Sequence, residues 1–168
     1  MAIDFALLIL RIVVGFVLFA HGAQKLFGWF GGHGLKGTGG WLASMGLQPA
    51  SIWALLAGLA EAGGGILMAL GLFNPIGPLG VIAAMLTAIS LVHWGKGLWA
   101  TEGGMELPLT NIAGALAVAL AGPGRYSLDA LLGISLPQPA TFVVGLVLVV
   151  LGVVASIALR SRQTALAH

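Results

Sequence analysis

The chain has 168 residues, of which 59% are hydrophobic and only 7% are charged. Soluble domains carry about 25% charged residues, so this chain has too few to cover a surface exposed to water. Disorder is excluded as well, because disordered chains combine low hydrophobicity with high charge. The net charge of +2 comes from dispersed basic residues. Nucleic-acid binding would require a basic patch or stripe, so we expect a lipid bilayer and no nucleic acid as partner.

The absence of cysteine removes several kinds of site. A disulfide framework, a thiolate metal site and an iron–sulfur cluster held by this chain are all excluded. Neither side of a membrane is favoured by this observation.

Five apolar stretches are candidates for membrane-spanning helices, each of which needs about 20 residues. They are residues 5–27, 52–72, 76–94, 107–122 and 140–159. The fourth is the shortest, and we expect it to tilt or to be partly buried against its neighbours. The fifth, from Ala140 to Leu159, carries no charge. We therefore predict an all-α, polytopic membrane helical bundle that forms a single domain over residues 1–168.

The connections between these stretches are rich in glycine. Residues 28–34 form a glycine-rich loop, and residues 38–46 are typical of a short interfacial helix. Residues 122–129 predict a turn followed by a short helix that Ser127 caps at its N-terminus. Cytoplasmic loops are enriched in Lys and Arg, so the charges place the C-terminus in the cytoplasm. Arg125 lies on one side, and five basic residues lie on the other: Lys25, Lys36, Lys96, Arg160 and Arg162.

The polar residues of the first, third and fourth stretches are predicted to meet at one face of the membrane. The first and third run in the same direction and the fourth begins where the third ends. The residues concerned are His21, Gln24, Lys25, His93, Trp94 and Asn111. All five tryptophans, Trp29, Trp41, Trp53, Trp94 and Trp99, fall at this face. Aromatic belts normally decorate both faces, so a one-sided set either anchors the interface or lines a ligand site.

Glu61 lies near the middle of the second stretch, where an ionised side chain costs at least about 2.5–3.5 kcal/mol. Helical side chains lean toward the N-terminus, so in antiparallel helices Glu61 leans toward His21 and Lys25. Arg11 leans toward the opposite face, where we expect it either to extend to the interface or to meet Asp4. Each charge has two interpretations. Glu61 is a functional or a packing residue, and Arg11 is either a structural charge or a partner of an anion or a quinone oxygen.

Metal and haem sites are alternatives that no local motif selects. His21, His93 and Glu61 could form a mixed nitrogen and oxygen metal site, but they lie on three helices without ligand spacing. The two histidines could serve as axial haem ligands by residue type alone. We therefore assign no metal-binding residue and leave the cofactor open.

The sequence resembles the DoxX family of small bacterial and archaeal membrane proteins over roughly residues 5–130. The resemblance is carried by Arg11-x3-Gly15-x3-Phe19-x-His21-Gly22-x-Gln24-Lys25-Leu26-Phe27-Gly28, by Glu61-x-Gly63-Gly64, by His93-Trp94 and by Gly122-Pro123-Gly124-Arg125-Tyr126-Ser127-Leu128-Asp129. It implies a four-helix core in a bacterial or archaeal cell membrane, to which residues 140–159 add a fifth helix. It also implies a loose link to redox chemistry, because the related DoxD protein is a subunit of a thiosulfate:quinone oxidoreductase.

Three functions follow as hypotheses. The leading one is a redox-associated subunit that binds quinone or a similar small electron carrier. Glu61, His21 and His93 would handle protons, and the ligand would be bound by Arg11, Gln24, Lys25, Trp94 and Asn111. The second is a scaffold for a soluble oxidoreductase, and the third is a proton-coupled small-molecule transporter. Small residues around Gly63 and Gly114 could also pack helices within the chain or between chains, the latter as a homo-oligomer.

Overall fold

The computed structural model describes the backbone of residues 1–166 and the side chains of residues 1–160. The described residues are helical and contain no strand. The α-helices are α1 (Ala2–Phe27), α2 (Gly34–Ser44), α3 (Ala50–Leu70), α4 (Ile76–Ala88), α5 (Glu106–Ala121), α6 (Leu128–Leu132) and α7 (Ala140–Leu166). A π-helical turn, η2 (Ile89–His93), and a 3-10 turn, η3 (Trp94–Lys96), prolong α4, and two further 3-10 turns are η1 (Trp29–Gly31) and η4 (Ala100–Glu102).

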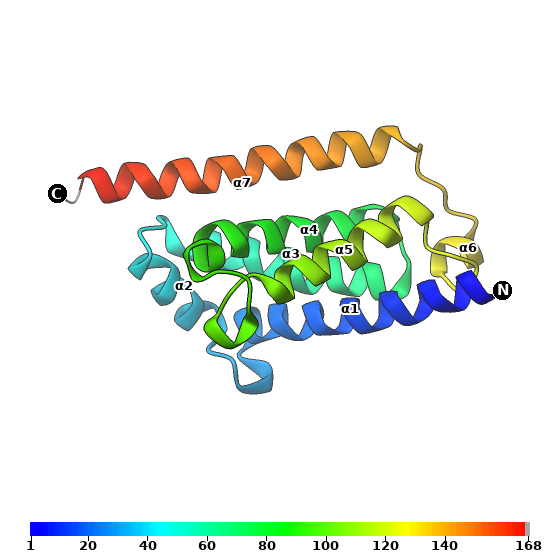
Figure 1. The fold of residues 1–168 in the computed structure, drawn as a ribbon, viewed down its shortest axis with the longest axis horizontal. Coiled ribbons are helices and arrows are strands. Elements are labelled where there is room, and N and C mark those ends of the chain that lie inside the picture. The colour runs from blue at the N-terminus through cyan, green and yellow to red at the C-terminus, as the bar shows by residue number, and fades with distance from the viewer. Residues whose placement is uncertain (167–168) are drawn as a thin grey trace.

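The long helices run up and down along one common direction (Figure 1). One end of the bundle carries α2, the C-terminal end of α1 and the start of α3, and we call it the α2 end. The other end carries the N-terminus, the connection from α3 to α4 and α6, and we call it the α6 end. This alternation brings the ends of α1 and α4 to the same side, as predicted from the sequence.

Four helical segments of the described chain are long and apolar enough to cross a membrane: Ala2–Phe27, Ala50–Leu70, Ile76–Lys96 and Ala140–Arg160. They correspond to four of the five predicted spans. Helix α5 has 16 residues. At about 1.5 Å per residue it extends roughly 24 Å, which is shorter than a hydrocarbon core of about 30 Å. The fourth predicted span is therefore the short helix that the sequence indicated.

The most extensive contact between helices joins α1 to α3, and it depends on glycine. A Cβ atom on Gly15 would lie 2.6 Å from the carbonyl oxygen of Gly65, and one on Gly65 would lie 2.5 Å from the carbonyl oxygen of Gly15. A Cβ on Gly22 would overlap Ala62. Lipid tails are as apolar as the side chains, so close backbone approach rather than hydrophobic burial holds such helices together.

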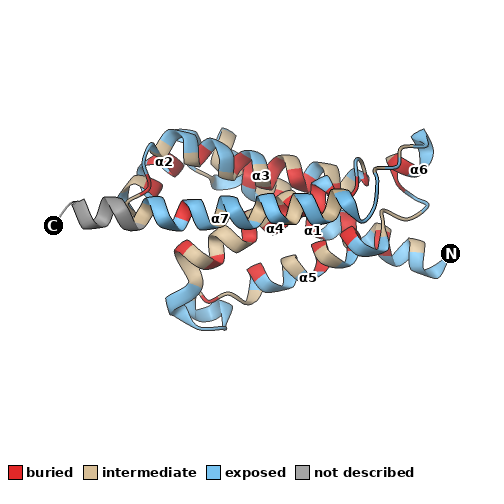
Figure 2. Cartoon of the chain, turned by 90° about the horizontal axis from the view of Figure 1, so that it is seen from above, coloured by how far each residue is buried: buried red, intermediate tan, exposed pale blue. Residues whose placement is uncertain are grey.

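Helices α5 and α7 differ in how closely they pack against the rest of the bundle. Gly114 of α5 faces Val14 and Leu10 of α1, so this predicted small-residue contact lies within the chain. A Cβ on Gly63 would meet nothing within 4 Å, so Gly63 packs against no other helix here. Helix α7 lies along the outside of α4 and is exposed over most of its length (Figures 1 and 2). Its apolar side chains suit contact with lipid.

Candidate functional site

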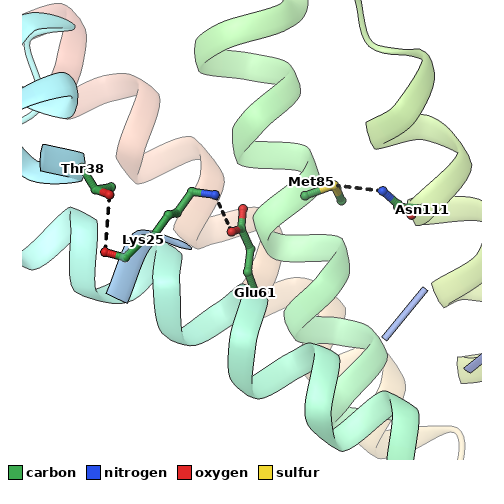
Figure 3. A network of polar contacts seen from close by, with 5 residues as sticks. All are labelled: Lys25, Thr38, Glu61, Met85 and Asn111. Atoms are coloured by element: carbon green, nitrogen blue, oxygen red, sulfur yellow. Dashed lines mark hydrogen bonds and ion pairs between the residues drawn. The ribbon is translucent and has the colours of Figure 1, made fainter. Parts of the chain in front are cut away.

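Glu61 of α3 forms an ion pair with Lys25 of α1 near the α2 end. The Lys25 Nζ lies 2.5 Å from Glu61 Oε2, and the two side chains are 24% and 7% exposed, respectively (Figure 3). The predicted approach of Lys25 to Glu61 is thereby confirmed. The close α1–α3 contact explains it, because Gly22 lies one turn before Lys25 and directly against Ala62. A buried carboxylate thus obtains a cationic partner from the neighbouring helix.

A cavity of about 370 Å³ opens beside Lys25, between the end of α1, the glycine-rich loop and α2. It is lined by Gln24, Lys25, Gly31, Gly32, His33, Gly37, Thr38 and Trp41. Helix α2 is held over the end of α1 by Thr38, which is buried and whose hydroxyl donates to the carbonyl oxygen of Lys25 over 3.4 Å (Figure 3). The Gln24 amide Nε2 donates to the carbonyl oxygen of Phe30 over 3.0 Å. The α2 end therefore combines a cation, a polar amide and an aromatic ring around one opening.

His21 occupies the same helix as Lys25 but is not part of this cavity wall. It is exposed, and no hydrogen bond joins it to another described residue. The neighbouring residues Gly22 and Ala23 are the ones that turn into the bundle. The role of His21 as a proton donor stays a prediction.

His93 is the last residue of the π-helical turn η2, which follows α4. Its Nδ1 lies 2.6 Å from the carbonyl oxygen of Gly103, which fixes the ring against the loop that leads to α5. A carbonyl oxygen only accepts, so Nδ1 carries the proton in this contact and Nε2 is the acceptor of the neutral ring. Turns of π-helix occur frequently at functional sites. Thr87 and Ser90, in the same stretch, donate to carbonyl oxygens of their own helix, those of Ala83 and Leu86.

The other predicted binding residues are spread over the α2 end. Trp94 is 74% exposed, and Trp29 and Trp99 are exposed as well. Of the five tryptophans, Trp41 is the one in the wall of the cavity described above. The Asn111 amide Nδ2 lies 3.8 Å from Met85 Sδ, where it joins α5 to α4 rather than facing Lys25 (Figure 3). Trp29, Trp94 and Trp99 are therefore exposed outside that cavity, and their role as interface anchors stays a prediction.

The prediction for Arg11 is wrong, because Arg11 neither extends to the interface nor meets Asp4. Its side chain is 0% exposed, and Nη2 donates to the carbonyl oxygen of Tyr126 over 2.5 Å. Asp4 instead lies 3.2 Å from the N-terminal ammonium and accepts from the backbone N–H of Arg125. The reason is the segment before α6, which folds back over α1 and offers Arg11 a backbone acceptor. Arg11 therefore lies at the α6 end, away from Lys25.

Asp129 connects several segments at the α6 end, a role that was not predicted from the sequence. Its carboxylate accepts from the backbone N–H groups of Phe73 and Asn74, each over 2.8 Å, and its own N–H donates to the carbonyl oxygen of Gly71. It also interacts electrostatically with Arg11. The signal available in the sequence was Ser127, whose predicted N-cap is confirmed by its bond from the N–H of Ala130. Asp129 thus ties α6 to the α3–α4 connection.

Within the described residues, the structure brings together no group of three His, Cys, Asp or Glu side chains that could hold a metal ion. The alternative of a site formed by His21, His93 and Glu61 therefore has no geometric support.

Comparison with known proteins agrees with the fold. The DoxX family model matches residues 6–94, which is 89 of the 168 residues. The chain belongs to the DoxX family. No curated protein and no solved structure matches it. The match runs from α1 to the end of η2, so this DoxX protein carries Arg11, Lys25, Glu61 and His93 within the family region.

The matched region is shorter than the resemblance noted from the sequence. Asn111 and the segment 122–129 lie beyond it, although Tyr126 and Asp129 contact or interact with residues inside it. Helices α5 and α7 also lie outside the match. In this DoxX protein the helical bundle is therefore completed by segments that lie outside the match.

Proposed function

We propose that this DoxX protein is a membrane subunit of a redox complex in a bacterial or archaeal cell membrane, where it binds the head of a quinone. The observation that carries the proposal is the partly buried Lys25–Glu61 ion pair, whose lysine lines a cavity. Intramembrane ionisable residues are costly, and by default they mark substrate paths or proton relays. At about 370 Å³, the cavity falls within the range of ligand pockets, about 300–1,000 Å³.

The chemistry required at such a site is the delivery of protons. Reduction of a quinone consumes two electrons and two protons and gives a quinol, and the electrons would come from a partner oxidoreductase. Lys25 would donate a hydrogen bond to one carbonyl oxygen and pass a proton to it. Glu61, the more buried partner, is ionised in the pair, so it would first take up a proton from water and then return it to Lys25. The second carbonyl oxygen would take its proton from water at the open side of the cavity. Gln24 and Trp41 line the same cavity and would contact the ring.

The test is quinone binding by the purified full-length protein in a mild detergent. Lipids extracted from the preparation are analysed for quinones, and added decylubiquinone is titrated by equilibrium dialysis. We expect Lys25→Met and Glu61→Gln each to weaken binding at least about tenfold, since each removes a charge-assisted contact or its support. The matched control is Lys36→Met, which removes an exposed lysine of α2 at the same end. His21→Ala, measured in parallel, tests the predicted role of that histidine.

Unchanged binding in both Lys25→Met and Glu61→Gln would refute the proposal, as would the absence of any quinone binding by the wild-type protein. If an oxidoreductase co-purifies equally with wild type and both variants while no quinone binds, the scaffold hypothesis is favoured. Solute flux into proteoliposomes that stops in Glu61→Gln would favour the transporter hypothesis. Tight glycine contacts along α1 and α3 argue against a continuous path between these two helices.

A further inference from the structure

We infer that the cavity at the α2 end distinguishes the oxidised from the reduced form of its ligand, and that Lys25 is the residue that does so. The inference rests on the proposed function and adds a preference for one redox state. It follows from an inventory of the hydrogen-bond donors and acceptors that the cavity wall offers. His33 is part of that wall, and its exposed ring offers nitrogen atoms that can donate or accept a hydrogen bond, while Gly31, Gly32 and Gly37 contribute backbone groups only.

Lys25 supplies the strongest hydrogen-bonding group in the wall. An ammonium group has three N–H donors and no acceptor, and the described structure uses one of them for Glu61 Oε2. Two donors are left on a side chain that is 24% exposed and that lines the cavity. Since Glu61 holds the ammonium on its buried side and Lys25 lines the cavity, we assign these two donors to a molecule bound there.

The neutral polar groups of the wall are partly engaged elsewhere. The Thr38 hydroxyl donates to the carbonyl oxygen of Lys25, and one N–H of the Gln24 amide goes to Phe30. The Trp41 indole N–H has no hydrogen-bond partner among the described residues, so it remains a second free donor. Gln24 Oε1 is a neutral acceptor. The acceptors of this wall are therefore neutral groups such as Gln24 Oε1, whereas its strongest donor is the charged Lys25 ammonium.

Among the described residues no carboxylate lines the cavity, and Glu61 lies behind Lys25 outside its wall. A quinol hydroxyl is a donor that needs an acceptor, whereas a quinone carbonyl only accepts. Hydrogen bonds to an ionised group are roughly twice as strong as neutral ones. The carbonyl form therefore gains a charge-assisted bond from Lys25, and the hydroxyl form is left with weaker neutral partners. Glu61 acts here as a positioning residue that holds Lys25 charged and in place.

The experiment compares decylubiquinone with decylubiquinol, measured by equilibrium dialysis under anaerobic conditions on the full-length protein in nanodiscs. We expect the oxidised form to bind about tenfold more tightly than the reduced form, the ratio that about 1.4 kcal/mol provides. The double variant Lys25→Met/Glu61→Gln removes both charges together and so leaves no buried charge unpaired. It should bind the two forms with equal affinity. Lys25→Arg keeps the cationic donor and should retain the preference, as should the control Lys36→Met.

The possible results separate the inference from the proposed function. A clear preference that disappears in the double variant and persists in Lys25→Arg supports the inference. Equal binding of both forms by the wild-type protein overturns it and leaves quinone binding intact. A preference that survives in the double variant also overturns it, since Lys25 would then not be the discriminating residue. If neither form binds, the proposed function fails together with the inference.

Discussion

Helix α1 carries two charged side chains into the bundle, and the two ends of the molecule use them differently. Arg11 at the α6 end is fully buried and donates to a backbone carbonyl oxygen, whereas Lys25 at the α2 end is partly exposed and pairs with Glu61. They are 14 positions apart, or about 21 Å along a helix at roughly 1.5 Å per residue. A charge inside a membrane helix therefore marks a candidate site when it also lines a cavity.

The difference lies in what surrounds each charge. Around Arg11, the partners belong to the backbone or to Asp129, which itself accepts from two backbone N–H groups. That arrangement holds α6 and the α3–α4 connection against α1. Around Lys25, one partner is a carboxylate and the other side is open to a cavity. A cavity of about 300 Å³ is present at the α6 end as well, where Asn74 and Asp129 are part of its wall, but Arg11 does not line it. Lys25, in contrast, lines the cavity at the α2 end.

The largest expected loss of stability is at Gly71, where the packing of the α6 end leaves no room for a side chain. Gly71 has a φ of +63°, and a Cβ atom there would overlap the buried Arg11 guanidinium. Strain at positive φ and overpacking each cost roughly 1–3 kcal/mol, so Gly71→Ala should lower the free energy of unfolding by about 2–6 kcal/mol. Reversible denaturation in detergent, followed by circular dichroism, measures it. The control is Gly63→Ala, whose Cβ meets nothing within 4 Å. Equal stability of the two variants would contradict the tight packing at Gly71.

The next effect tests whether Lys25 and Glu61 depend on each other. Lys25→Met leaves a buried carboxylate without its partner, and breaking a buried pair in this way costs about 3–5 kcal/mol. Lys25→Met/Glu61→Gln removes both charges and should recover most of that loss. The measurement is a double-mutant cycle of unfolding free energies. Additive effects of the two substitutions would show that the pair is not coupled, and the contrast with Arg11 would lose its basis.

A smaller effect is expected when Arg11 is replaced by lysine. Lysine keeps the charge but lacks the Nη2 donor that reaches the Tyr126 carbonyl oxygen, and a hydrogen bond to a charged group contributes about 1.5–3 kcal/mol. Arg11→Lys should therefore lower stability by about that amount while leaving quinone affinity unchanged. The control is Arg125→Lys, since Arg125 is exposed. A loss of quinone binding in Arg11→Lys would instead connect the α6 end to the site.

The smallest effect is expected at Thr38, which joins α2 to α1. Its bond to the Lys25 carbonyl oxygen is 3.4 Å long, so Thr38→Val should cost less than about 1 kcal/mol of stability. The affinity for decylubiquinone should change less than about threefold, because the Lys25 side chain is untouched. Both quantities are measured as for the other variants. A tenfold loss of affinity would show that α2 must be held in place for binding.

The site was predictable from the sequence only in part. Glu61 and Lys25 could be paired in advance because the antiparallel order of two spans makes their side chains lean together. His21 and Trp94 could not be assigned to the inside or the outside, since an amphipathic residue at an interface suits both positions. Asn111 was expected near Lys25 because its helix begins at that face, yet the rotation of α5 turns its amide to Met85. Helix rotation depends on packing and not on hydropathy.

By itself, the sequence determined that the chain is a membrane helical bundle, where four long spans lie, and which residues gather at each end. Those properties follow from local hydropathy and from the alternating direction of successive spans, which require no knowledge of packing. Only the tertiary structure decided that Arg11 bonds to Tyr126, that Asp129 holds the α3–α4 connection, and that a cavity opens beside Lys25. These contacts join residues up to 115 positions apart. They depend on how closely glycine lets the helices approach, which the pattern of apolar residues does not record.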